Sequence, residues 1–480
     1  MYTMNNNTPI LVWLRRDFRL HDNPALKAAQ ETGRPVIPVF ILDEVMANFG
    51  AAPKWRLGKA IECFNKSLND IGSHLIIRQG KALDVLLELV KETGAKSVYW
   101  SRAYDPMAIS RDKIVKAGLK LIDIEAKSFK GFLVFEPWLA KTKAGTFFKV
   151  YSPMWRSLQN ISVDPEVLDV TSLNIPVSWP NSMSLDDLKL HVKMNRGAKI
   201  VENYATVGER LALSKLKDFL SNKINSYKDK RDNLGEDFNS GLSENLAWGE
   251  ISVRRMWFAA ENAKQIGLRG AEHFQKEIAW REFAYHLSYH TPQIETENWR
   301  IEWNGFPWSG DCEEAEKWRR GRTGEPLIDA AMRELYITGK MHNRARMLVA
   351  SYLTKHLLVD WRVGKKWFEE TLIDWDPASN AMGWQWVAGC GPDAAPYFRI
   401  FNPQGQAEKF DAKAIYQNNY LNNGCNGSER ALSFYEAVPK SWKLSCKDAY
   451  PKALIDLKVG RERALLAYKS LKSKDNEKFS

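Results

Sequence analysis

Residues 10–42, ILVWLRRDFRLHDNPALKAAQETGRPVIPVFIL, contain an apolar run at 10–14, a helical pattern at 23–31 and a second apolar run at 35–42. Strands that are apolar at nearly every position are typical of a parallel sheet whose two faces are both covered. A helix between two such strands lets them run in the same direction. This stretch therefore predicts a strand–helix–strand unit of an α/β fold.

The same alternation continues to about residue 125. Further strands are predicted at 74–77, 96–100 and 119–124, and further helices at 54–71, 81–93 and 106–117. No GxGxxG follows the first strand and no GxxxxGK[ST] occurs in the chain, so the usual dinucleotide and P-loop signals are absent. We expect residues 1–130 to form an α/β domain with a Rossmann-like parallel sheet.

The pattern changes twice after that domain. Prolines separated by Ser and Asn between residues 131 and 197 indicate a linker over the surface. From residue 198 to 480 the pattern is helical, which predicts a larger all-α domain. Apolar residues recur there at three- and four-residue spacing in six segments: 208–221, 252–266, 272–290, 326–338, 343–361 and 367–372.

The composition excludes some classes of protein. With 480 residues, 44% hydrophobic and 26% charged, the chain is not disordered as a whole. It has no apolar run of the roughly 18–20 residues that a membrane span needs, and its first residues do not resemble a secretory signal. Five cysteines without a CxxC pair argue against disulfides and a structural zinc site. We expect a soluble, cytoplasmic protein with no membrane partner.

Two further numbers favour a nucleic-acid partner and a flat ligand. Sixty-nine basic residues against 58 acidic ones give a formal charge of +11, which favours a polyanion. Nineteen Trp residues exceed the needs of packing, because each buried indole N–H requires a partner. Stacking on a flat ligand, or electron transfer, would use them. We predict no metal site among the eight histidines and no nucleophilic Ser–His or Cys–His pair.

Two helical segments place polar side chains beside soft or aromatic ones. Glu277 and Trp280 are separated by three residues, and Asn343 shares a helix face with Arg346 and Met347. Taken alone, these residues leave two interpretations open. One is a buried polar network with a methionine filling a gap. The other is a pocket for a flat, amide-rich ligand.

Residues 380–403, NAMGWQWVAGCGPDAAPYFRIFNP, and 11–24, LVWLRRDFRLHDNP, closely resemble the DNA photolyase/cryptochrome family. The resemblance extends from about residue 9 to about residue 470. It implies an α/β antenna domain and a helical domain that binds FAD in a U shape. Within the family, the chain is most similar to photolyases that act on cyclobutane pyrimidine dimers.

The resemblance implies a lesion pocket. Glu277 would hydrogen-bond the flipped dimer, while Trp280 and Trp386 would stack on it. Asn343 and Met347 would face the flavin and the lesion, at positions where (6-4) photolyases typically have His. To donate a hydrogen bond to a dimer carbonyl, Glu277 would have to be protonated; the alternative is a structural ion pair.

The position beside flavin N5 separates repair from signalling. The resemblance places Asn380 there, where plant cryptochromes usually have Asp and animal ones Cys. Outside the pocket, it places Arg231, Arg344 and Arg399 at DNA phosphates. Excited reduced flavin would then transfer an electron to the dimer.

The flavin-binding positions match the family pattern less completely than the lesion pocket does. Asn239 stands where relatives commonly have Thr, so one expected hydroxyl is missing from the diphosphate loop. Three indoles, Trp384, Trp361 and Trp308, match the path by which oxidised flavin is photoreduced. The matched flavin-binding residues are Tyr227, Asn239, Ser240, Gly241, Leu242, Ser243, Phe274, Arg346, Asp374, Asp376 and Asn380.

A second, antenna chromophore is left open. Met107 and Ala108 replace the Asn–Glu pair that holds a folate in some relatives. The alternatives are a folate held differently, a deazaflavin, a flavin or no antenna at all.

The sequence predicts an FAD-dependent, light-driven enzyme that repairs cyclobutane pyrimidine dimers in UV-damaged DNA. The alternatives are a cryptochrome-type photoreceptor without repair activity and a (6-4) photolyase. The resemblance further implies a monomer without an obligate protein partner.

Overall fold

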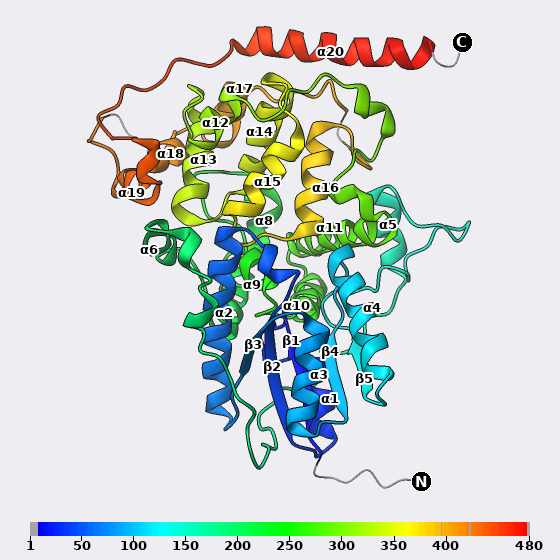
Figure 1. Cartoon of the computed structure of the whole chain (residues 1–480). Coiled ribbons are helices and arrows are strands. Elements are labelled where there is room, and N and C mark those ends of the chain that lie inside the picture. Colours follow the sequence, from blue (N-terminus) through cyan, green and yellow to red (C-terminus); the bar gives the residue numbers. More distant parts are fainter. Residues whose placement is uncertain (1–7, 395, 422–423, 478–480) are drawn as a thin grey trace.

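A computed structural model describes residues 8–394, 396–421 and 424–477. Five parallel strands form a sheet at the N-terminal end, and the other regular elements of the described chain are helices joined by loops (Figure 1). The predicted fold class is therefore confirmed. The sheet order is β3-β2-β1-β4-β5, with strands β1 (Ile10–Leu14), β2 (Val36–Leu42), β3 (Ile76–Gln79), β4 (Ser97–Ser101) and β5 (Glu125–Phe129).

Helices cover both faces of the sheet. Alternate side chains of β1 point to opposite faces, so Val12 packs with α1 (Pro24–Glu31) and α2 (Ala51–Asp70). Trp13 packs in the other layer, with α3 (Ala82–Thr93) and α4 (Pro106–Lys120). Strands β1 and β2 are buried along their whole length, because helices cover both faces of the sheet there.

The predicted position of the fifth strand is wrong. The apolar run at 119–124 ends helix α4 and forms the following turn, where Leu121 is 86% exposed. The strand itself, β5, has the polar sequence EAKSF and pairs only with β4. An edge strand buries less of its surface than a central one, so an apolar run was a misleading guide here.

The helical region contains sixteen further α-helices in the described part of the chain. None of the described helices is both long and apolar enough to span a membrane. The bounds are α5 (Tyr151–Leu158), α6 (Gly197–Glu202), α7 (Glu209–Asp218), α8 (Ile224–Lys230), α9 (Ser243–Ala247), α10 (Val253–Gln265), α11 (Ala271–His290), α12 (Glu313–Arg319), α13 (Pro326–Thr338), α14 (Asn343–Ser351), α15 (Trp361–Thr371), α16 (Pro377–Ala388), α17 (Pro403–Phe410), α18 (Ile415–Tyr420), α19 (Glu429–Ala437) and α20 (Leu457–Glu477).

Two of the predicted helices are interrupted. The segment 343–361 is not one helix. Helix α14 ends in a π-helical turn, Tyr352–His356, and the helical conformation is interrupted at Leu358, whose φ is +56°. Asp360 starts α15 by accepting a hydrogen bond from the backbone N–H of Arg362. The apolar spacing continued across this break, so periodicity alone did not reveal it. In the same way, a π-helical turn separates α7 from α8.

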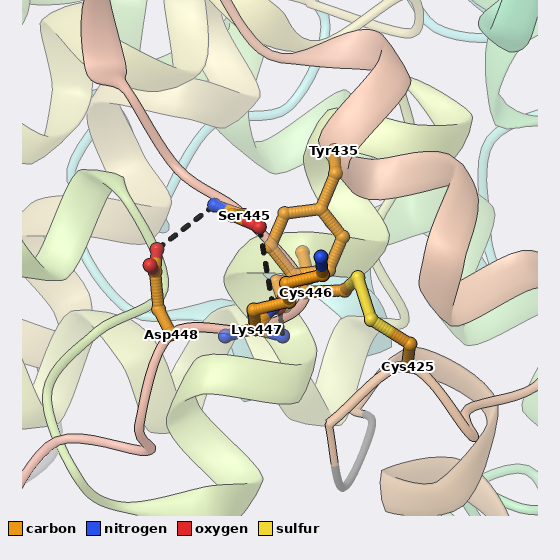
Figure 2. Close-up of a disulfide and its surroundings, with 7 residues drawn as sticks. Cys425, Tyr435, Ser445, Cys446, Lys447 and Asp448 are labelled. Carbon is orange, nitrogen blue, oxygen red and sulfur yellow. Dashed lines mark hydrogen bonds between the residues drawn. A yellow bond between two sulfur atoms is a disulfide. The ribbon is translucent and has the colours of Figure 1, made fainter.

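The expectation of unpaired cysteines is wrong for one pair. Cys425 and Cys446 form a disulfide, with 5.1 Å between their Cα atoms (Figure 2). The turn that contains Cys446 is closed by Asp448, which accepts a hydrogen bond from the Ser445 N–H at 2.8 Å. Neither the separation of 21 residues nor the surrounding composition indicated this pairing. Cys63, Cys312 and Cys390 are free.

Candidate active site

A cavity of about 510 Å³ lies among α9, α11, α14, α15 and α16. Its lining is mainly apolar and aromatic, with charged groups at a few positions. Most of the side chains predicted from the sequence meet here: Arg231, Ser243, Glu277, Trp280, Asn343, Arg346, Met347, Asp374, Asp376, Asn380, Trp384 and Trp386. The structure thus brings together residues that lie up to 155 positions apart in the chain, from Arg231 to Trp386.

Local sequence starts two of these helices beside the cavity. His342 begins α14 because its ring accepts the N–H of Arg344. Asp376 begins α16 by accepting the N–H of Ser379, with Pro377 in the first turn. On α16, Asn380 and Trp384 are one turn apart, so both reach the cavity.

Trp280 is stacked on an aromatic partner that the sequence analysis missed. The ring of Tyr151, on α5, lies 3.7 Å from the Trp280 ring at an interplanar angle of 7°. The Tyr151 hydroxyl donates to the carbonyl of Lys276 at 2.8 Å, which holds the ring against α11. One face of the indole is therefore covered. No motif joins residue 151 to residue 280, so only the structure reveals this pair.

Glu277 is ion-paired with Arg231. The same guanidinium nitrogen, Nη1 of Arg231, lies 2.8 Å from Nε2 of His273. Burial opposes the charge on Arg231, but the hydrogen bond to Glu277 and the charges of Tyr227, Glu277 and Asp232 together outweigh it and raise the pKa of Arg231 above its ordinary value. The arrangement is the ion pair that the sequence analysis gave as the alternative to a protonated Glu277. It favours the ionised carboxylate.

A second ion pair also lines the cavity. Arg346 donates to Asp374 Oδ2 at 2.7 Å. The Asp374 side chain is almost wholly buried, and its other oxygen, Oδ1, has no hydrogen-bond partner. The indole N–H of Trp384 is likewise buried and unpartnered. A buried acceptor and a buried donor without partners indicate a site shaped for a polar ligand.

Asp376, in contrast, has hydrogen-bond partners at both carboxylate oxygens. It accepts from the Tyr285 hydroxyl at 2.6 Å and from Arg16 at 3.3 Å. Burial opposes its charge, but Arg16 and Arg281 together lower the pKa of Asp376. Because Arg16 follows strand β1, this carboxylate also joins the sheet to α16.

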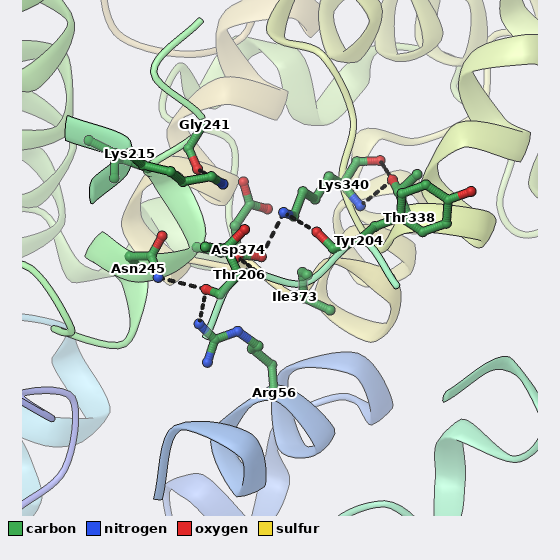
Figure 3. A network of polar contacts seen from close by, with 12 residues as sticks. Arg56, Tyr204, Thr206, Lys215, Gly241, Asn245, Thr338, Lys340, Ile373 and Asp374 are labelled. Carbon is green, nitrogen blue, oxygen red and sulfur yellow. Dashed lines mark hydrogen bonds and ion pairs between the residues drawn. The ribbon is translucent and has the colours of Figure 1, made fainter. Parts of the chain in front are cut away.

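Two lysines from other parts of the chain lie beside the predicted diphosphate loop, residues 239–243, and were not predicted from the sequence. Lys215 donates to the Gly241 carbonyl at 3.0 Å, and Gly241 has a φ of +63°. Lys340 bonds the carbonyl of Tyr204 at 2.7 Å and the buried carboxylate of Glu244 at 2.9 Å (Figure 3). Burial, and then the charge of Lys340, lowers the pKa of Lys215. Cationic groups therefore surround this loop.

Other predicted flavin residues lie outside the cavity lining. Asn239 bonds His342 at 2.9 Å and the Arg231 carbonyl at 3.3 Å. Tyr227 and Phe274 are buried and pack on Phe219 in the neighbouring apolar cluster.

The three predicted electron-transfer indoles are differently placed. The ring centroid of Trp384 lies 5.0 Å from that of Phe368 and 6.1 Å from that of Trp318. Trp308 is stacked on Trp303, with 5.6 Å between the ring centroids. Within the described residues, no ring contact joins Trp361 to Trp384 or Trp308. Trp361 is wholly buried, and its N–H donates to Asn298 at 2.8 Å.

The remaining predicted DNA contacts, Arg344 and Arg399, do not line the cavity. Arg344 is ion-paired with Asp232 and lies over the ring of Phe410. Arg399 is exposed, and its carbonyl accepts from the buried Lys355 at 3.1 Å. Among the described residues, no cluster of His, Cys, Asp and Glu is arranged to hold a metal ion.

A second, smaller cavity of about 170 Å³ lies where the carboxyl ends of β1 and β4 meet the helical region. Met107 and Ala108 line it from α4, and Glu295 lines it from the turn after α11. Burial, and then the charge of Asp105, raises the pKa of Glu295 to about 7. Four arginines lie in the lining of this cavity: Arg15, Arg16, Arg102 and Arg111.

Two family models match the chain. One, described as the FAD binding domain of DNA photolyase, matches residues 274–470, and the other, described as DNA photolyase, matches residues 10–169. The chain is 42% identical over 471 residues to a deoxyribodipyrimidine photo-lyase from Agrobacterium fabrum, covering 97% of this chain and 98% of that one. It is 32% identical to cryptochrome-2 of Arabidopsis thaliana, covering 87% of this chain and 71% of the relative.

The fold is also similar to a solved structure along its whole length. The crystal structure of a bacterial class III photolyase from Agrobacterium tumefaciens superposes with a TM-score of 0.89 at 40% identity. The match covers 98% of this chain and 99% of that protein.

Proposed function

The chain belongs to the DNA photolyase family, and we propose that it is a deoxyribodipyrimidine photolyase that repairs cyclobutane pyrimidine dimers in DNA with FAD and light. One observation carries the choice of activity. The 510 Å³ cavity combines Trp280 and Trp386 as aromatic walls with Glu277 and Asn343 as hydrogen-bonding groups. A flat, amide-bearing lesion needs both kinds of group.

The unpartnered polar atoms of the cavity fit FAD. Asp374 Oδ1 offers a buried acceptor, and Arg346 holds that carboxylate in place. We propose that Arg346, Asp374 and Asn380 hold the isoalloxazine, and that residues 239–243, with Lys215 nearby, hold the diphosphate through backbone N–H groups and hydroxyls. When bound and reduced, FAD supplies the light-driven electron that splits the dimer.

The lesion is proposed to enter between the two indoles. Extruding a poorly stacked dimer costs only a few kcal/mol, and stacking on an aromatic side chain returns roughly 1–3 kcal/mol per base. The ring of Tyr151 is stacked on one face of Trp280 and fixes the orientation of the indole, whose other face is proposed to stack on the lesion. Arg231, Arg344 and Arg399 are proposed to contact phosphates, which makes binding sensitive to salt.

Asn343 and Met347 support cyclobutane dimers over (6-4) lesions. Both line the cavity beside Glu277, and neither supplies the imidazole found at these positions in (6-4) photolyases. Asn380 lies in the same cavity and supports repair over signalling.

Three further proposals concern the rest of the molecule. Trp384, Trp361 and Trp308 are proposed to carry electrons to oxidised flavin. The 170 Å³ cavity is the proposed place of an antenna chromophore, with folate, deazaflavin and flavin as alternatives. We propose a cytoplasmic monomer without an obligate protein partner.

Repair is the decisive test. Purified, photoreduced protein is mixed with an oligonucleotide that carries one thymine cyclobutane dimer, or one (6-4) lesion, in blue light and in darkness. We expect only the cyclobutane substrate to be restored, and only in light. Failure to restore either lesion, with flavin bound and reduced, would assign the chain to the photoreceptors.

A further inference from the structure

His273 lies one helical turn before Glu277, and its contact with Arg231 requires a neutral imidazole ring. Its Nε2 atom lies 2.8 Å from Nη1 of Arg231. A guanidinium can only donate hydrogen bonds, so Nε2 of His273 must accept, and the ring proton sits on Nδ1. The Arg231 nitrogen therefore has two acceptors, a carboxylate and an imidazole.

The proposed roles of Arg231 and Glu277 are incompatible with their pairing. Arg231 cannot turn to a DNA phosphate while it holds Glu277, and an ionised Glu277 cannot donate a hydrogen bond to a dimer carbonyl. Breaking the pair also leaves the carboxylate without its cation. Another group must then neutralise it, since an unpaired, half-buried charge is costly.

His273 is the group best placed to do so. Its Nε2 atom is 3.7 Å from Glu277 Oε1. The charged and titratable groups that face it are Tyr227 of α8, Arg231 and Asp232 just after α8, and Lys276 and Glu277 of α11. Burial, and then the charge of Arg231, lowers the pKa of His273 below its ordinary value. Removing Arg231 from Nε2 reverses the second effect and leaves Glu277 as the nearest charge.

We propose that His273 takes up a proton when Arg231 moves to a phosphate of damaged DNA, and replaces Arg231 as the partner of Glu277. This inference rests on the proposed function. One proton enters from solvent and binds Nε2 of His273; no electron moves. From Nε2 the proton can pass to Glu277 Oε1, which gives a neutral imidazole and the protonated carboxyl that a dimer carbonyl requires. His273 is thus a positioning residue that couples lesion binding to proton uptake.

The experiment measures dark binding as a function of pH. Full-length protein with bound flavin is titrated with a duplex that carries one thymine cyclobutane dimer, at pH 6, 7 and 8. Uptake of one proton predicts that affinity falls with rising pH, by up to about tenfold per pH unit. The variant His273→Gln keeps an acceptor for Arg231 but cannot be protonated, so we expect its affinity to be nearly independent of pH.

Two controls keep the result interpretable. His191→Gln removes an exposed histidine on a distant turn and should retain the pH dependence of the wild-type protein. Isothermal titration calorimetry of the wild-type protein, in two buffers of different ionisation enthalpy, counts protons without any variant. The calorimetry should show net uptake with the dimer duplex and less uptake with undamaged duplex.

The proposal fails if the wild-type protein binds the dimer with no pH dependence and no proton uptake, or if His273→Gln retains both. Absence of any preference for the dimer at every pH would instead contradict the proposed function. The two failures are therefore distinguishable.

Discussion

The two cavities of this molecule differ in how their walls are built. The 510 Å³ cavity is lined largely by short motifs on α11, α14 and α16, each of which places several side chains on one helix face. The 170 Å³ cavity takes its wall from the ends of two strands, from α4, and from segments near Glu295 and Lys365. A helix face can be recognised from residue spacing, whereas a wall shared by many distant segments requires the fold.

Their chemistry differs as well. Four indoles and two methionines line the large cavity, which suits stacking on flat rings. Four arginines and four carboxylates are among the residues that line the small cavity, and they suit a ligand with charged groups. If this contrast is right, substitutions in the large cavity change lesion binding, and substitutions in the small one do not.

The largest effect is expected for Trp280→Ala. The change removes an aromatic wall, and stacking on an aromatic side chain is worth roughly 1–3 kcal/mol per base. We expect dark affinity for a dimer-containing duplex to fall by about 5–150-fold, with FAD still bound. Fluorescence anisotropy measures the affinity, and the flavin absorbance measures the cofactor.

The matched control for this prediction is Trp138→Ala. Trp138 is 37% exposed and lines neither cavity, so the loss of an indole there should leave affinity unchanged. Equal affinities for wild type and Trp280→Ala would contradict the stacking role.

A smaller effect is expected for Tyr151→Ala. The substitution uncovers the rear face of Trp280 and removes a stacked pair worth about 0.5–1.5 kcal/mol. Dimer affinity should fall by about 2–12-fold. The variant Tyr151→Phe keeps the ring and loses only the hydroxyl that bonds Lys276, so it should bind nearly as wild type does. If both variants bind alike, the ring does not support Trp280.

These two residues show what a sequence can predict. Trp280 shares a helix and a motif with Glu277, so its place in the site followed from spacing and resemblance. Tyr151 reaches the same place from another helix, and His273 matters only because Arg231 folds against it. A partner that lies elsewhere in the chain has no local signature.

The fold shows the same limit. Strands β1 and β2 were predictable because they are apolar at nearly every position. The edge strand β5 is polar, and its predicted position was several residues too early in the chain. The break at Leu358 and the disulfide between Cys425 and Cys446 depend on how distant segments meet. Neither changes the hydrophobic spacing from which helices are predicted.

The small cavity predicts a pH-dependent stability. Glu295 in the folded protein titrates near pH 7, against about 4.5 in an unfolded chain. Between these values the unfolded chain binds fewer protons, so Glu295 lowers stability as pH rises through this window. Glu295→Gln should therefore raise the melting temperature at pH 8 but not at pH 4.5.

The expected gain for Glu295→Gln is only about 0.5–1 kcal/mol at pH 8, because solvent screening and the weakened hydrogen bond from Ser288 offset part of the shift. Differential scanning calorimetry at both pH values measures it. Glu297→Gln, an exposed neighbour, is the control and should change neither melting temperature. A stabilisation of equal size at both pH values would contradict the assignment.

The smallest effect is expected for Met107→Asn, and it tests whether the two cavities are independent. Met107 is 60% exposed at the start of α4, so replacing it should change stability by no more than about 0.5 kcal/mol. Because it lines only the small cavity, dark affinity for the dimer duplex should stay within about twofold of wild type. The property that this variant can change is the absorbance of an antenna chromophore in the purified protein, measured in addition to the absorbance of flavin. A loss of dimer affinity as large as that of Tyr151→Ala would show that the small cavity is coupled to the lesion site, and the contrast drawn between the two cavities would not hold.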